Sequence, residues 1–81
     1  MSPYWPDGQP IAVAGTEPER LEWQGRMHGV ERISDHWRVH TNWWQREVWR
    51  DYWEVVTDTG LWCVIYQDLL THTWLLERIY E

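Results

Sequence analysis

The chain has 81 residues, of which 43% are hydrophobic and nine are tryptophan, and its formal net charge is -6. This length allows one domain, and the acidic charge argues against general attraction to nucleic acids or membrane surfaces. Each large aromatic side chain buries roughly 150–250 Å². We therefore expect some of the tryptophans to lie on the surface, in contact with a partner or a second copy.

The first ten residues are rich in residues that interrupt regular structure, namely Pro3, Pro6, Gly8 and Pro10. They predict an irregular N-terminal arm over residues 1–10, followed by a single β domain over residues 11–81 that starts with a short edge strand. The N-terminus lacks the basic and apolar regions of a signal peptide. No apolar run approaches the ~20 residues that a membrane span needs. A cytoplasmic location without a membrane partner is expected.

Alternation of polar and apolar residues predicts a strand over residues 20–23, followed by a two-residue hairpin turn at Gln24-Gly25. Residues 26–39 fit a long strand that bends near Gly29. A short helix over residues 31–38 fits the same apolar spacing, so both interpretations stay open at this point.

A turn over residues 40–42 is expected to lead into the strongest strand pattern, over residues 43–57. A turn at residues 58–60 precedes a strand over residues 61–67, and the last strand covers residues 73–80. The first two strands of this antiparallel meander are apolar on both faces, so both faces must be covered. The predicted fold is all-β, a small antiparallel sheet or partly open barrel of five or six strands.

The C-terminal half carries a characteristic set of aromatic and turn residues: Arg50-Asp51-Tyr52-Trp53, Thr57, Gly60, Tyr66, Asp68, Trp74-Leu75-Leu76 and Tyr80-Glu81. Together with residues 23–30, they resemble a small uncharacterised bacterial domain. That domain is found alone and at the C-terminus of ImuB-type proteins, the Y-family DNA polymerase relatives of bacterial mutasomes. The resemblance covers about residues 20–81, with Trp53 in place of a tyrosine and Gln67 in place of an arginine. It implies an accessory module in DNA damage tolerance.

No residues are arranged for catalysis. Ser2 and Ser34 do not lie on a nucleophile elbow, and Cys63 lies in an apolar strand that predicts a buried, inert thiol. His36 and His40 are four residues apart and could bind zinc from one face, but solvated histidines near a turn are the simpler interpretation. We expect no enzymatic activity, no metal and no cofactor.

Arginine is concentrated in the middle of the chain, where residues 20–50 hold six arginines against four acids, whereas residues 51–81 have a net charge of -5. Arginine interleaved with tryptophan is typical of protein-interaction hot spots and of single-stranded nucleic-acid binding. A Trp43-Trp44 pair beside a turn cannot place both rings on one face. The predicted binding surface consists of Trp43, Trp44, Arg46, Trp49 and Arg50.

The sequence thus predicts a non-catalytic protein-interaction module, accessory to DNA repair and translesion synthesis. Two alternatives stay open. One is a single-stranded nucleic-acid-binding module that uses the same tryptophan and arginine residues. The other is a structural module whose aromatic residues form a homodimer.

Overall fold

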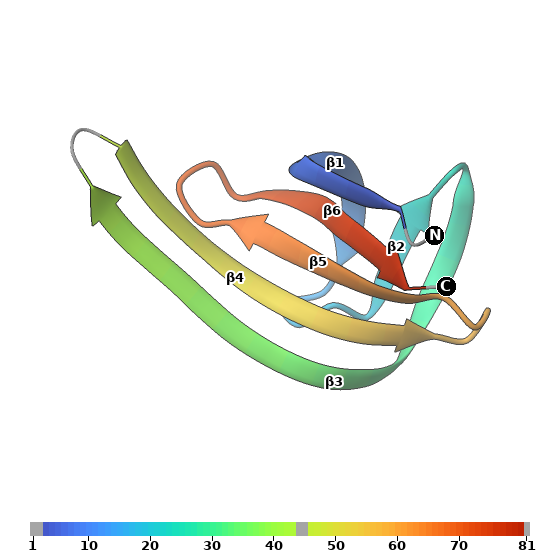
Figure 1. Cartoon of the computed structure of the whole chain (residues 1–81). Coiled ribbons are helices and arrows are strands. Elements are labelled where there is room, and N and C mark those ends of the chain that lie inside the picture. Colours follow the sequence, from blue (N-terminus) through green and yellow to red (C-terminus); the bar gives the residue numbers. More distant parts are fainter. Residues whose placement is uncertain (1–2, 44–45, 81) are drawn as a thin grey trace.

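The fold is described by a computed structural model that covers residues 3–43 and 46–80. Its strands are β1 (Tyr4–Ala14), β2 (Arg20–Trp23), β3 (Arg26–Trp43), β4 (Arg46–Thr57), β5 (Trp62–Asp68) and β6 (Thr73–Tyr80). All neighbours are antiparallel, and β1 pairs with both β2 and β6. The sheet therefore closes into a ring that is not a regular barrel (Figure 1). The predicted all-β fold, with β4, β5 and β6 as the C-terminal meander, is confirmed.

Two of the predicted hairpin turns are confirmed. Gln24 and Gly25 have φ values of 51° and 74°, the left-handed conformations of a two-residue turn that matches the twist of its strands. The turn between β4 and β5 ends at Gly60, whose φ is 85° and whose amide donates a hydrogen bond to the Thr57 carbonyl.

The expected turn over residues 40–42 is wrong, because β3 continues to Trp43 and pairs there with Arg46. The helical alternative over residues 31–38 is also wrong, because these residues are part of β3, which pairs with β4. His40 and Thr41 lie opposite Trp49 and Val48 on β4. Cross-strand contacts of this kind outweigh the weak local turn preference of a His-Thr-Asn sequence.

The N-terminal segment differs from the expected irregular arm, because β1 begins at Tyr4. Tyr4 pairs with Arg78 and Gln9 pairs with Leu76, and the register shifts between these two pairs. Trp5 packs against the core inside this irregular stretch. Residues before position 11 thus help to close the ring.

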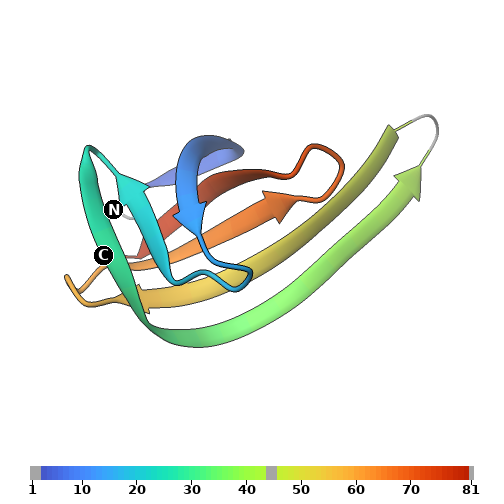
Figure 2. The same ribbon diagram turned by 180° about the vertical axis from the view of Figure 1, so that it is seen from behind.

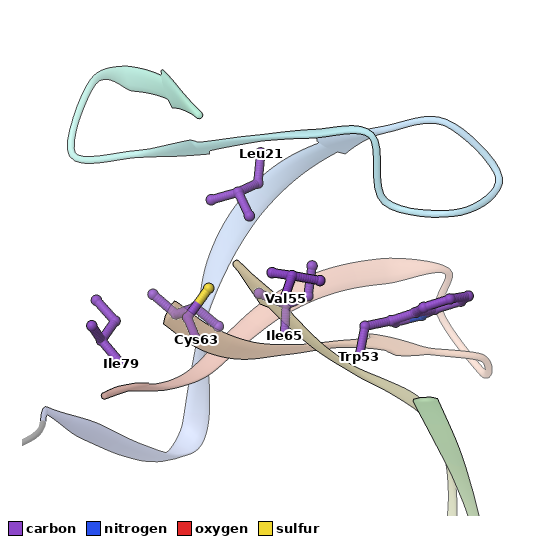
Figure 3. Packing of buried hydrophobic residues seen from close by; sticks show 7 residues of the cluster. Leu21, Trp53, Val55, Cys63, Ile65 and Ile79 are labelled. Carbon is purple, nitrogen blue, oxygen red and sulfur yellow. The ribbon is translucent and has the colours of Figure 1, made fainter. Parts of the chain in front are cut away.

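The main core lies inside the ring and is formed by Leu21, Trp53, Val55, Cys63, Ile65, Leu76 and Ile79 (Figure 3). β1 and β2 cross over the meander and cover this interior (Figure 2). A second buried cluster, made by Tyr52, Val64 and Tyr66, lies on the outer face of the meander. β1 shields part of this second cluster from solvent, and the Tyr66 hydroxyl donates a 3.4 Å hydrogen bond to the Asp7 carbonyl of β1.

In the described part of the chain, no helix has the length and apolar character that crossing a membrane requires.

Candidate binding surface

A two-stranded ribbon extends from one end of the ring (Figures 1 and 2). We define the ribbon as residues 36–43 of β3 and residues 46–53 of β4. β5 pairs with β4 only from Arg50 onwards, so the outer half of the ribbon has no third strand among the described residues. The ribbon exists because β3 and β4 stay in one unbroken register from Asp35–Glu54 to Trp43–Arg46.

The outer edge of β3 is open along the ribbon. β2 pairs with β3 only over residues 26–29, and from Val30 onwards every described pairing of β3 is with β4. This leaves one side of β3 without a neighbouring strand. An edge of this kind presents unpaired N–H and C=O groups to the surroundings.

Two hydrogen bonds establish which peptide groups face that edge. The Leu69 amide donates to the Trp49 carbonyl at 2.8 Å, so the peptide groups of Trp49 face away from its partner His40. His40 is therefore in a non-hydrogen-bonded pair, and its own peptide groups face outward. The His36 amide is also not used by β4, since it donates to the Asp35 carboxylate at 2.8 Å. Successive residues of a strand turn their peptide groups alternately toward and away from the partner strand. Arg38 lies two residues from both His36 and His40, so its peptide groups face the open edge as well.

One face of the ribbon carries two histidine–carboxylate pairs. His36 Nε2 lies 2.6 Å from Asp51 Oδ1, and its ring stacks on Trp53 with centroids 3.5 Å apart. Farther out, His40 Nε2 lies 2.8 Å from Glu47 Oε2. Both acids of the ribbon are thus already held by its own histidines, while the Arg38 side chain is 57% exposed and reaches Asp51 only at 3.6 Å.

The opposite face carries a row of aromatic rings that runs across three strands. Trp37 stacks on Tyr52 with centroids 5.3 Å apart, and Tyr52 contacts Tyr66 at 4.9 Å. The row is buried at Tyr66 and 37% exposed at Trp37. Burial raises the pKa of the Tyr66 phenol, and the guanidinium of Arg50 beside it opposes part of that increase.

The five residues predicted for binding do not share one face. Trp49 stacks on His40 with centroids 5.0 Å apart, whereas Arg50 lies on the other face, 4.8 Å above the Tyr66 ring. Arg46 is exposed at the outer end of β4. The side chain of Trp43 and the whole of Trp44 lie outside the described residues. The role of these five residues in binding stays a prediction.

Sequence reasoning missed the open edge of β3 and the contribution of Trp37. Trp37, Tyr52 and Tyr66 are far apart in the chain, and only the register of three strands brings their rings together. A clue was available in Trp37 and Val39, which alternate with the polar residues His36, Arg38 and His40. That alternation is the signature of a strand with two different faces.

The two histidines considered as zinc ligands are four residues apart and are each paired with a different acid. Within residues 3–43 and 46–80, no three His, Cys, Asp or Glu side chains gather as a metal site. Cys63, the other reactive side chain considered, is buried, and burial raises the pKa of its thiol to about 12. The most distinctive feature for binding is therefore the ribbon and its open edge.

Comparison with known proteins gives no matching protein family, no matching curated protein and no matching solved structure. The resemblance to the ImuB-type C-terminal domain stays a prediction.

Proposed function

We propose that this chain is a non-catalytic protein-interaction module that binds an extended, acidic segment of a partner protein along the open edge of β3. The observation that carries the proposal is the outward orientation of the peptide groups of Arg38 and His40 on an edge with no described neighbouring strand. Addition of a strand to such an edge is a recurring way in which β domains bind peptides.

The regularity of the outer edge supports this proposal. Register shifts of β3 lie between Val30 and Arg32 and between Ile33 and Asp35, close to the ring. From His36 to Trp43 the register has no shift, and the segment contains no proline or lysine. Bulges, prolines and lysines are the usual means by which proteins protect an exposed edge from pairing. Their absence from this segment leaves it available for a partner strand.

Charge favours an acidic partner. The ribbon carries three arginines against two acids, a formal charge of +1, whereas the rest of the chain carries four arginines against eleven acids, a charge of -7. The two ribbon acids are engaged by His36 and His40. An acidic segment is therefore attracted to the ribbon and repelled by the rest of the chain. Two ribbons side by side would bring like charges together, which disfavours a second copy as the occupant.

The experiment compares two proline variants. In Arg38→Pro, the lost N–H is one that faces the open edge, so the fold should persist while strand addition is blocked. Arg38→Ala is the matched control for loss of the side chain. In Val39→Pro, the lost N–H faces β4, so the ribbon itself should be destabilised by at least one hydrogen bond, about 1 kcal/mol.

Binding is measured with a phage-displayed library of twelve-residue peptides selected on the wild-type chain. We expect acidic peptides to bind Arg38→Ala less tightly than wild type, since one ribbon charge is lost, and to bind Arg38→Pro about tenfold or more weakly than Arg38→Ala, since edge hydrogen bonds are lost as well. Peptides that bind the Arg38→Pro variant as tightly as wild type would contradict strand addition. The resemblance to mutasome proteins makes acidic segments of replication and repair proteins the first natural sequences to test.

Two measurements separate the alternatives. Salt-sensitive quenching of tryptophan fluorescence by an oligo-dT strand would instead favour single-stranded nucleic-acid binding by the arginines of the ribbon. A dimer mass in solution that reverts to a monomer in Arg38→Pro would favour pairing between two copies.

A further inference from the structure

A second candidate site lies at the other end of the ring, away from the ribbon tip. A hollow of about 350 Å³ opens there, and its walls include Trp5, Trp23, Gln24, Arg26, His28 and Leu61. The turn between β2 and β3, the start of β1 and the end of β6 lie at this end of the molecule (Figures 1 and 2). We call this hollow the mouth. Its volume is near the lower limit for small-molecule pockets, which corresponds to one compact ligand or one side chain.

The apolar wall of the mouth is a corner made by two indoles. Trp5 of β1 and Trp23 of β2 contact each other edge to face, with centroids 5.2 Å apart and planes inclined by 70°. Both side chains are only partly buried. Two flat surfaces at this angle fit an aromatic or other apolar group against both rings.

A buried imidazole contributes a hydrogen-bond donor to the mouth. His28 is only 7% exposed, and its Nδ1 lies 2.6 Å from the Thr59 hydroxyl. The Thr57 hydroxyl is buried, accepts a hydrogen bond from the Leu61 amide and lies 2.9 Å from the Thr59 hydroxyl.

This chain of hydrogen bonds accommodates the tautomer of His28 that carries its hydrogen on Nε2. The hydrogen of the buried Thr57 hydroxyl needs an acceptor, and the Thr59 oxygen is the one that the described contacts provide. When Thr59 donates its own hydrogen to His28 Nδ1, the neutral imidazole carries its hydrogen on Nε2. A protonated imidazole carries a hydrogen there as well. In both states Nε2–H is a donor, and no partner for it is present among the described residues.

The other polar groups of the mouth favour an anion. Arg26 contributes only donors, and none of the described residues that line the mouth is Asp or Glu, although the chain has thirteen of them. A planar guanidinium matches the two oxygens of a carboxylate. The chain as a whole has a charge of -6, but the mouth is lined by Arg26 and by no described acid. The charge of the mouth is therefore opposite to that of the rest of the chain.

We propose that the mouth binds a carboxylate carried on a compact aromatic or apolar group. The apolar group packs in the Trp5–Trp23 corner, Arg26 pairs with the carboxylate, and His28 Nε2–H donates a hydrogen bond to it. Two sources offer this chemistry, a free aromatic acid and the C-terminal residue of a peptide. The site is independent of the ribbon and of the partner proposed for it.

The test uses four probes: 3-phenylpropionate, its neutral amide, the peptide N-acetyl-Gly-Gly-Phe with a free C-terminus, and the same peptide amidated. Binding is followed through the indole N–H resonances of Trp5 and Trp23, assigned with single Trp→Phe variants. We expect saturable shifts with the free carboxylates and binding of the amides that is about tenfold or more weaker, because a hydrogen-bonded charge is lost. If only 3-phenylpropionate binds, the source is a free aromatic acid. If the peptide with a free C-terminus binds as well or binds alone, the C-terminal residue of a peptide also fits the site.

The variant Arg26→Gln should weaken binding of the carboxylates about tenfold or more, because it removes the charge and the fork of donors. Arg20→Gln is the matched control, since Arg20 is an exposed residue of β2 that does not line the mouth. It should leave binding unchanged. Amides that bind as tightly as acids, carboxylates that do not bind, or an Arg26→Gln variant with wild-type affinity would each overturn the proposal.

Discussion

Trp53 connects the core of the ring to the ribbon. Its ring is 6% exposed and stacks almost parallel to His36, with planes inclined by 8°. His36 in turn pairs with Asp51, so one indole supports the first residue pair of the ribbon. Its Nε1 is buried and has no described hydrogen-bond partner. The stability that Trp53 provides must therefore come from packing, since its polar atom contributes nothing favourable.

We expect Trp53→Ala to lower the free energy of unfolding by about 3–5 kcal/mol, which is typical of a buried aromatic side chain replaced by alanine. Trp62→Ala is the control, because Trp62 is 46% exposed on the outer face. It should cost about 1 kcal/mol. Urea unfolding followed by circular dichroism measures both. Equal losses in the two variants would show that Trp53 does not support the core in this way.

The buried thiol of Cys63 makes stability depend on alkaline pH. The pKa of this thiol is raised from 9.0 to about 12 by burial. Between these values the folded chain keeps a proton that the unfolded chain loses, so stability is full below pH 9 and falls as pH rises. The expected slope approaches about 1.4 kcal/mol per pH unit. Urea unfolding between pH 8 and pH 10 should show this decline in wild type and lose it in Cys63→Ala, and a parallel decline in both would exclude the thiol as its cause.

At the scale of elements, the open edge of β3 has a consequence that needs no partner. The peptide groups of Arg38 and His40 face outward, while those of Val39 and Thr41 face β4. Neighbouring amides in one strand thus differ in whether they are hydrogen-bonded. This difference is a property of the ribbon and is independent of its side chains.

We expect amide hydrogen exchange to alternate along the ribbon. The amides of Arg38 and His40 should exchange about tenfold or more faster than those of Val39 and Thr41, because only the latter pair is bonded to β4. Exchange monitored by NMR at single-residue resolution measures this pattern. Equal protection of all four amides would indicate that something already pairs with the edge.

The identity of the elements was largely predictable from the sequence, whereas their extent was not. Alternating apolar residues and turn signals identified all six strand segments, the first only as a short edge strand from residue 11, since these signals are local. The continuation of β3 through residues 40–43 depends on Val48 and Trp49 across the ribbon. Similarly, the entry of Tyr4 into β1 depends on Arg78 at the other end of the chain. A pairing partner on another strand leaves no signal in the local pattern of either segment, whether it lies across a hairpin or at the other end of the chain.

At the scale of the whole molecule, β1 closes the ring by pairing with β6, and at Gly8 it passes close to Tyr66 of the outer cluster. Gly8 has a φ of 77°, and a Cβ placed on it would lie 2.8 Å from Leu75 Cβ and collide with the Tyr66 hydroxyl. The absence of a side chain at this position lets β1 pass over Tyr66. The sequence marked Gly8 only as part of an irregular arm, because its neighbours across the ring are far away in the chain.

We expect Gly8→Ala to destabilise the fold by about 2 kcal/mol or more, through both a left-handed backbone and overpacking. Gly25→Ala is the matched control, because Gly25 has a similar φ of 74° and nothing within 4 Å of the added Cβ. It should cost only about 1 kcal/mol, the backbone contribution. Thermal and urea unfolding of both variants measure the difference, and equal costs would argue against a close contact between β1 and Tyr66.

The Trp5–Trp23 pair also gives the molecule an optical property. Two indoles 5.2 Å apart and inclined by 70° have coupled electronic transitions, and coupled transitions produce a pair of circular dichroism bands of opposite sign. The two rings belong to different strands and meet only when β1 and β2 are both in place. The strength of this couplet therefore reports, without any label, whether β1 and β2 are both in place.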